Sequence, residues 1–313
     1  MRRLTLVMLV TTVTSMPLMA DTETINGYTW TYHIIGDTVE IGREYDYDYT
    51  AISPWPTGAV TVPSMLGGKA VTSIGRYAFY DCSGLTSLTI PSSVTNIGGR
   101  AFCGCSGLTS VTIPDSVMSI DWDTFYNCTS LTNVTIGNNV TNIGDGAFGG
   151  CSGLTSVTIP DSVTSIGDSA FSGCTGLASV TIPDSVTSIG AYAFYNTPFD
   201  GNQPDGLLVF GRVVYKMKGA CPAVVMIPEG ITSIGYSAFS GCSGLTNVTI
   251  PDSVMDIGVS AFEGCSGLAS VTIPDSVTNI GESAFEGCSG LTSVTIPVSV
   301  TDIGGQHFLV AAV

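Results

Sequence analysis

Phenylalanine recurs at a fixed interval of 23 residues along most of this chain. A repeat period of about 20 to 50 residues indicates a solenoid, because one unit cannot bury its own apolar face and must stack on its neighbours. The length agrees, since 313 residues exceed what a single unbroken core normally reaches. The repeated positions are Phe79, Phe102, Phe125, Phe148, Phe171, Phe194 and, after one irregular gap, Phe239, Phe262, Phe285 and Phe308.

Each repeat unit begins with a strand-like segment. In the unit that starts at Cys151, apolar residues stand at Leu154, Val157 and Ile159. This spacing is typical of the strand in leucine-rich repeats, and its last part alternates as a half-buried strand requires. Pro160 and the polar residues after it predict a turn that ends the strand.

The rest of the unit predicts a second extended segment and a helical turn. Val163 to Ile166 read as a short strand on the opposite wall. Asp168 or Ser169 can cap one helical turn at residues 170–172, which Gly173 closes. We therefore expect an α/β solenoid of the leucine-rich-repeat type, with short parallel strands and one short helical turn in each 23-residue coil. In-register coils would hide their apolar residues in one continuous core.

The phrases IPDSVTSIG, AFSGC and GLTSVTIP carry a family resemblance. They resemble the BspA-like leucine-rich repeats of bacterial surface proteins and of some parasitic protists, over residues 60–308. The resemblance implies the repeat fold and a surface or secreted protein that adheres to host proteins or to other cells. It brings no catalytic residues and no cofactor.

The interruptions of the repeat predict how the chain is divided. Residues 21–59 lack the period and contain two alternating stretches around Gly36 and Asp37, which predict a hairpin within an N-terminal β-rich cap. We expect a repeat array over residues 60–197 and its continuation over residues 227–313. Between them, residues 198–226 predict an irregular coil that carries a hairpin around Gly211 and Arg212.

Residues 1–20 have the layout of a secretory signal peptide. Arg2 and Arg3 precede an apolar run over residues 4–13 that is too short to span a bilayer, and small and apolar residues continue to Ala20. We expect a secreted or cell-surface protein. No later stretch is long and apolar enough to insert the mature chain into a membrane.

Charge excludes two classes of partner. Removal of residues 1–20 takes away Arg2 and Arg3 and leaves 9 − 2 = 7 basic residues against 25 acidic ones, a net charge of −18. Such a chain repels nucleic acid and anionic membranes. The sequence leaves the oligomeric state open.

Ten cysteines suggest disulfides in an exported chain, but most of them repeat with the coil. Side chains at equivalent positions would lie about 4.8 Å apart, which is wider than the spacing of about 3.8 Å that a disulfide prefers between its Cβ atoms. Cys103 and Cys221 are out of step, so we expect these two to be the reactive or paired cysteines, and we expect no metal and no cofactor. The predicted free, buried thiols are Cys82, Cys105, Cys128, Cys151, Cys174, Cys242, Cys265 and Cys288.

The outward positions of the predicted strands carry mainly Ser and Thr. We interpret this uncharged face either as a merely soluble surface or as a contact surface for an extracellular protein or a glycan; ordering of water, as in ice-binding rods, is a further alternative. The segment Glu44 to Tyr49 alternates acids and tyrosines, which can stack on a partner or pack on the first coil. The candidate partner-binding residues are Ser156, Thr158, Ser179, Thr181, Thr249, Thr272, Tyr45, Tyr47 and Tyr49.

Catalytic residue types are scarce. The two histidines, His33 and His307, fall at opposite ends of the predicted rod, so they cannot share a site. The aspartates that follow the strand prolines are expected to be turn residues, and an acid-based hydrolase at the cap or hairpin is the less favoured alternative. We expect a binding protein and no enzyme. These aspartates are Asp115, Asp161, Asp184, Asp252 and Asp275.

Overall fold

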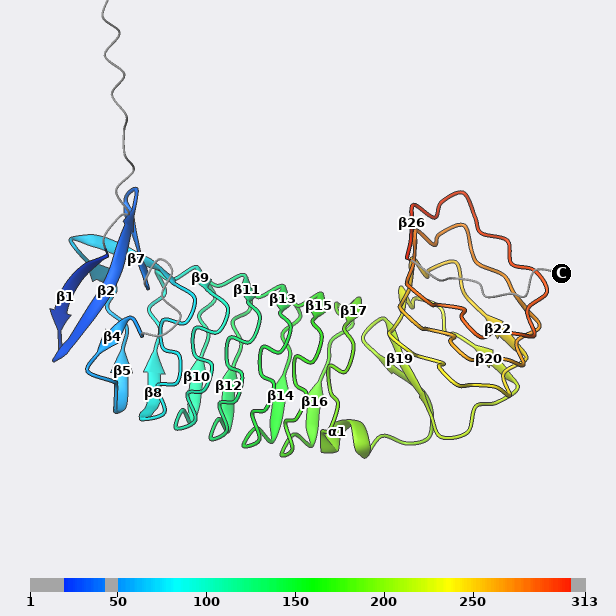
Figure 1. The fold of residues 1–313 in the computed structure, drawn as a ribbon, viewed down its shortest axis with the longest axis horizontal. Helices are drawn as coiled ribbons and strands as arrows, with labels where there is room; N and C mark the ends of the chain where they lie inside the picture. The colour runs from blue at the N-terminus through cyan, green and yellow to red at the C-terminus, as the bar shows by residue number, and fades with distance from the viewer. Residues whose placement is uncertain (1–19, 43–49, 305–313) are drawn as a thin grey trace, which may run out of the picture.

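The computed structural model describes residues 20–42 and 50–304. An N-terminal sheet is followed by a row of stacked coils, a junction, and a second row of coils set at a marked angle to the first (Figure 1). The N-terminal sheet has the order β1-β2-β3-β7-β6, with β4 paired to β2, and β9 of the first row pairs with β7. Its strands are β1 (Asp21–Ile25), β2 (Tyr28–Ile35), β3 (Thr38–Ile41), β4 (Ile52–Ser53), β6 (Met65–Leu66) and β7 (Lys69–Ile74).

Three tight hairpins build this sheet, one of which joins β6 to β7 through Gly67 and Gly68. β2 and β3 pair antiparallel with Ile35 opposite Thr38, which confirms the hairpin predicted around Gly36 and Asp37. The third hairpin joins β1 to β2 through Asn26 and Gly27, a dipeptide that favours such turns. β3 then pairs in parallel with β7, so the sheet passes directly into the solenoid.

The longer strands of successive coils form one side of the solenoid, which we call the strand wall. The strand wall consists of β5 (Gly58–Thr61), β8 (Leu85–Thr89), β10 (Ser110–Thr112), β12 (Asn133–Thr135), β14 (Ser156–Thr158) and β16 (Ser179–Thr181), then β20 (Val224–Met226), β22 (Asn247–Thr249) and β24 (Ser270–Val271). Its strands form three sheets, β12-β10-β8-β5, β14-β16 and β20-β22-β24. Within each sheet, equivalent residues of neighbouring coils pair in parallel, as Ser156 with Ser179 and Thr158 with Thr181.

Two-residue strands form a second side, the short wall. They pair in parallel at the same spacing, for example Ile143 with Ile166 and Ile166 with Ile189. The short wall consists of β9 (Asn96–Ile97), β11 (Ser119–Ile120), β13 (Asn142–Ile143), β15 (Ser165–Ile166) and β17 (Ser188–Ile189), then β21 (Ser233–Ile234), β23 (Asp256–Ile257), β25 (Asn279–Ile280) and β26 (Asp302–Ile303).

The third side, the turn wall, corrects the prediction of a helical turn in each coil. Residues 168–173 form consecutive turns without helix. The Ser169 and Phe171 amides donate to carbonyls of the next coil, Ala191 and Ala193, each at 2.8 Å. Since these amides bond between coils, they cannot make the bonds to the fourth preceding residue that an α-helix requires. Ser169 and Gly173 also have positive φ angles of 54° and 73°, which interrupt a right-handed helix.

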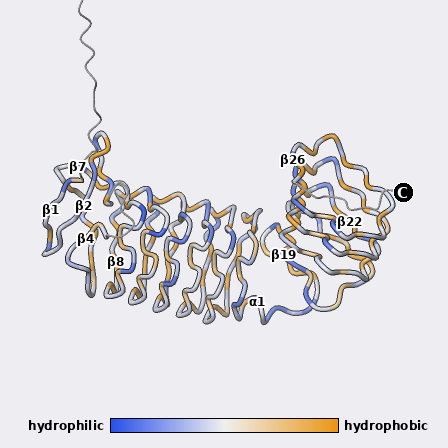
Figure 2. The backbone as a smooth tube through the Cα atoms, viewed as in Figure 1, coloured by the Kyte–Doolittle hydropathy of each residue, from blue (hydrophilic) through white to orange (hydrophobic). Residues whose placement is uncertain are grey.

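The phenylalanines form the centre of the core, as the repeat predicts. Phe148, Phe171 and Phe194 are fully buried and stack face to face, with ring centroids 5.3 Å and 5.6 Å apart. Apolar and polar residues alternate along each coil (Figure 2). Burial of each ring contributes about 1.5 to 3 kcal/mol to stability.

The core is divided, which corrects the prediction of one continuous core. One apolar cluster extends from the N-terminal sheet to Val213, and a second extends from Val214 to Leu291. Val213 and Val214 are neighbours in β19 (Val213–Lys218). Successive residues of a strand point to opposite faces, so β19 closes one core and opens the other.

We call residues 197–222 the junction. It contains α1 (Pro198–Gly201), which is the only helix in the described residues, and the hairpin of β18 (Gly206–Phe210) with β19 around Gly211 and Arg212. β19 follows β17 along the short wall, where the Arg212 amide donates to the Val186 carbonyl at 2.8 Å. Gly211 has a φ angle of 58°, and a Cβ there would lie 2.5 Å from the Val186 oxygen, so this close approach needs glycine.

On the strand wall the junction leaves an interruption. β16 is the last strand of the first row and β20 begins a separate sheet, β20-β22-β24. α1 lies against the end of the first row, where the buried Phe199 donates its amide to the Leu177 carbonyl at 2.7 Å. On the short wall one backbone hydrogen bond links the coil of β17 to β19, although these strands belong to separate sheets. The two rows of coils meet at an angle at this junction (Figure 1).

Most repeating cysteines are free, buried thiols, as predicted. The Cys151 thiol, for example, donates to the carbonyl of Phe125 at 3.1 Å. Cys242 is an exception, since it forms a disulfide with Cys221 across a Cα–Cα distance of 5.5 Å. Cys151 bonds to the carbonyl of a phenylalanine 26 residues earlier in the chain. The residue 26 positions before Cys242 is Lys216 of the hairpin, so Cys242 has no phenylalanine carbonyl at that position. Cys221 is paired as expected, whereas Cys103 is free and buried.

Candidate interaction surface

The strand wall presents the six predicted hydroxyl residues to solvent. In β14 and β16 the outward residues are exposed, while Val157 between them on β14 is buried. The same pattern continues after the junction, where Thr249 and Thr272 are exposed beside the buried Val248 and Val271. The exposed candidates are Ser156, Thr158, Ser179, Thr181, Thr249 and Thr272.

Other hydroxyls of the coils are already occupied. Thr109 Oγ1 donates to the Thr86 carbonyl at 3.0 Å, and Thr164 Oγ1 donates to the Thr141 carbonyl at 3.2 Å. These threonines support the stacking of one coil on the next. By contrast, none of the six candidate hydroxyls makes a side-chain hydrogen bond within the described residues, so each can bond to a partner or to water.

Several candidates cannot be placed on this surface. Tyr45, Tyr47 and Tyr49 lie outside the described residues, as does His307. His33 is 7% exposed within β2 and is a residue of the N-terminal sheet. The candidate partner-binding residues that the structure describes therefore all lie on the strand wall.

Acidic side chains cap the coils. Asp145 Oδ1 accepts a bond from the Asp168 amide at 2.8 Å, and Asp168 Oδ1 accepts one from the Ala191 amide at 2.7 Å. Asp115 Oδ1 likewise accepts from the Asn138 amide at 2.7 Å. These carboxylates satisfy backbone donors of the following coil, which is a structural role.

The turn wall carries an open trough of about 670 Å³ between the aromatic rings of Trp122 and Tyr126 and the small residues of the next two coils. The Arg100 guanidinium lies 4.9 Å from the Trp122 ring centroid and pairs with Asp123 at 2.9 Å. The hydrogen bond that Arg100 donates to the Asp123 carboxylate raises the pKa of Arg100. The basic side chain here is thus engaged within the chain.

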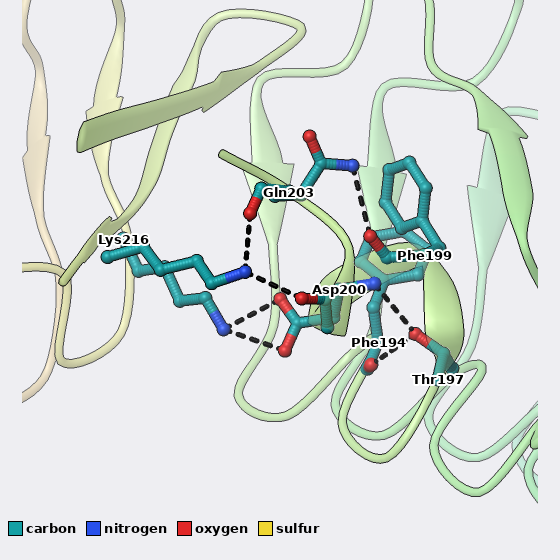
Figure 3. A network of polar contacts seen from close by, with 8 residues as sticks. Phe194, Thr197, Phe199, Asp200, Gln203 and Lys216 are labelled. Atoms are coloured by element: carbon teal, nitrogen blue, oxygen red, sulfur yellow. Dashed lines mark hydrogen bonds and ion pairs between the residues drawn. The ribbon is translucent and has the colours of Figure 1, made fainter. Parts of the chain in front are cut away.

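At the junction, two lysines of the hairpin hold α1 in place (Figure 3). Lys216 Nζ lies 2.6 Å from Asp200 Oδ1, and Lys218 Nζ donates to the Gly201 carbonyl at 2.7 Å. Thr197 Oγ1 caps α1 by accepting from the Asp200 amide at 3.1 Å. These lysines therefore serve the fold.

Tyrosines gather beside this network. Tyr192 and Tyr195 are 54% and 60% exposed, and the hydroxyl of Tyr192 lies 3.2 Å from that of Tyr236 in the second row. This hydrogen bond raises the pKa of Tyr192. The tyrosine pair connects the two rows on the turn wall.

Sequence reasoning missed one feature of the strand wall. In β20 the outward residues are Val224 and Met226, which are 56% and 74% exposed. They pair with Asn247 and Thr249 of the next coil, so apolar side chains stand where the later coils have polar ones. The sequence could have shown this, because residues 224–228 (VVMIP) align with residues 247–251 (NVTIP) and place Val and Met at the positions of Asn and Thr.

Residues 20–42 and 50–304 contain neither a metal-binding cluster nor a membrane-crossing helix. No group of three His, Cys, Asp or Glu residues there is arranged to hold a metal ion. The short α1 is far below the length and apolarity of a membrane-crossing helix, and no other helix is described.

These features define the class of protein: a solenoid of short coils with parallel strands, whose strand wall presents mainly polar side chains to solvent. The BspA type leucine rich repeat region matches residues 72–199 and 221–311 in six copies, so the chain belongs to this family. No curated protein sequence matches the chain.

Solved structures of repeat proteins are also similar. A leucine rich cell surface protein from Faecalibacterium prausnitzii is 29% identical, with 90% of this chain and 84% of that chain covered and a TM-score of 0.46. A leucine-rich repeat protein from Bacteroides ovatus is 25% identical, with 88% and 89% covered and a TM-score of 0.36.

Proposed function

We propose that this chain is a secreted or cell-surface binding module that adheres to an extracellular protein through its strand wall. The observation that carries the proposal is the set of exposed, unpaired hydroxyls that repeats along the strand wall. Membership of the BspA-type family supports a repeat protein that binds other proteins. The apolar leader over residues 1–20 supports export.

The chemistry of the wall suits a broad polar contact. Ser, Thr and Asn at the outward positions both donate and accept hydrogen bonds, and they carry no charge that must be desolvated. Parallel strands lie about 4.8 Å apart, so the hydroxyls repeat at a spacing that a large protein surface can contact at many points. The proposal assigns no catalytic step to the chain.

The test is a binding assay with matched variants. Residues 21–313 are immobilised and screened by biolayer interferometry against purified extracellular matrix proteins and, separately, against a glycan array. We expect binding to a protein, and we expect Thr158→Lys with Thr181→Lys to weaken it at least tenfold. Ser165→Lys with Ser188→Lys places the same charges on the short wall of the same coils and should leave binding unchanged.

Two results would contradict the proposal. Equal binding by the two double variants would remove the site from the strand wall, and binding to glycans alone would replace the protein partner. Cell fractionation checks the location, since the proposal requires the chain in the medium or at the cell surface.

A further inference from the structure

The strand β20 has an unpaired edge. It pairs with β22 on one side and ends the sheet β20-β22-β24 on the other. In β22, the Thr246 and Asn247 amides donate to the Ala223 carbonyl of the preceding coil, at 2.8 Å and 3.1 Å. The corresponding amides 23 residues earlier belong to Ala223 and Val224, and no strand of the described residues precedes them. A sheet edge of this kind is a template for another strand.

The side chains of this edge leave it unprotected. Proteins commonly guard an edge strand with charged residues or with proline inside the strand. Val224 and Met226 are instead apolar and 56% and 74% exposed. Pro222 and Pro228 stand before and after the strand, so each residue of β20 retains its amide.

A shallow, open apolar hollow lies directly beside the edge. It has a volume of about 470 Å³ and is lined by Leu207 and Met217 of the hairpin, by Pro222, and by β20 itself. The Cys221–Cys242 disulfide ties the residue before Pro222 to the second row of coils. This covalent link holds the edge and the hollow in a fixed relation before any partner arrives, which lowers the entropic cost of binding.

Charge selects the kind of partner. Between residue 219 and residue 304 the chain has no Lys or Arg. Glu229 stands three residues after the end of β20 and Asp252 stands 23 residues later, and both are exposed, while Asp205 lines the hollow. None of these three takes part in an ion pair within the described residues. A second copy would bring the same acidic surface, whereas a basic segment is complementary to it.

We infer that β20 is a second binding site, for an extended peptide segment of a partner protein that adds to the sheet as a strand. The segment has uncharged, apolar or β-branched side chains opposite Val224 and Met226, and a Lys or Arg at its end. It occupies the place that the preceding coil's strand holds elsewhere in the strand wall, and one of its side chains fills the hollow. This mode goes beyond the proposed function, because it uses backbone pairing at the junction instead of hydroxyls on the wall.

The test begins with ten-residue peptides displayed on phage and selected on residues 21–313 with the disulfide intact. We expect enrichment of alternating apolar or β-branched sequences that carry a terminal Lys or Arg. The best selected peptide is then synthesised, labelled and titrated by fluorescence anisotropy. Its affinity should fall at least tenfold for Met226→Lys and for Val224→Pro, and should be unchanged for Thr272→Lys two coils away.

A chemical control addresses the possibility that a variant fails to fold. N-methylation at alternate residues of the peptide, in the register that faces β20, should abolish binding to the unmodified chain, and methylation in the other register should not. The Thr158→Lys with Thr181→Lys variant should bind the peptide normally, which separates this site from the strand-wall site.

Three results would overturn the inference. They are no enrichment of peptides, equal affinity for both methylation registers, and concentration-dependent dimerisation that Met226→Lys abolishes, which would make a second copy the occupant.

Discussion

Phe171→Ala tests the stacked core at the place where its geometry is most regular. The ring is fully buried and stacks on Phe148 at 5.3 Å and 10° and on Phe194 at 5.6 Å and 7°. Truncation removes the ring's burial and leaves a cavity between two coils that cannot collapse without shifting the strand pairs. We expect a loss of about 3 to 5 kcal/mol in the free energy of unfolding.

Thermal unfolding followed by circular dichroism measures this loss. For a body of roughly 150 to 250 residues, each kcal/mol shifts the Tm by about 2 to 4 °C, so we expect a decrease of about 6 to 20 °C. Thr158→Ala in the same coil is the matched control, since an exposed side chain should change stability by about 0.5 kcal/mol or less. A decrease no larger than that of the control would refute the stacking of the phenylalanines.

Two further predictions concern the cysteines. Cys221→Ser opens a loop of 21 residues and should lower stability by about 3 kcal/mol, measured by urea denaturation; an unchanged midpoint would contradict a formed disulfide. Burial raises the pKa of Cys82 to about 12 and that of Cys103 to about 11. Because these thiols lose their protons more readily in the unfolded chain, the free energy of unfolding should fall as the pH rises above the ordinary thiol pKa toward 11 to 12. Urea midpoints that stay constant from pH 8 to pH 10.5 would refute this.

The sequence predicted the coil and its interior well. Recurrent Phe, Leu and Cys positions identify buried sites because stacking forces equivalent residues into one register, as Cys151 and Phe171 illustrate. The turn wall could not be predicted in the same way. Ser169 adopts a positive φ angle although it is not glycine, because its amide bonds to the next coil, and this interaction is invisible within a single repeat.

The junction shows a second limit. The hairpin around Gly211 was predictable from its alternating residues, but the division of the core was not, because it depends on β19 closing one apolar cluster and opening the next. The pairing of Cys221 with Cys242 could not be predicted either, because it depends on the hairpin standing where other coils provide a phenylalanine carbonyl for the thiol. For the candidate site, exposure of Thr158 and Thr181 follows from strand alternation, whereas the exposed edge of β20 arises only when the strand wall is interrupted.

Thiol counting tests the central claim, that in-register coils bury their repeating side chains in a stacked core. The structure places eight free cysteines in the interior and joins the other two in one disulfide. With an aromatic disulfide reagent at neutral pH, the native chain should release almost no colour. Unfolded in guanidinium it should titrate eight thiols, and ten after reduction. Rapid reaction of several thiols in the native chain would contradict the stacked core.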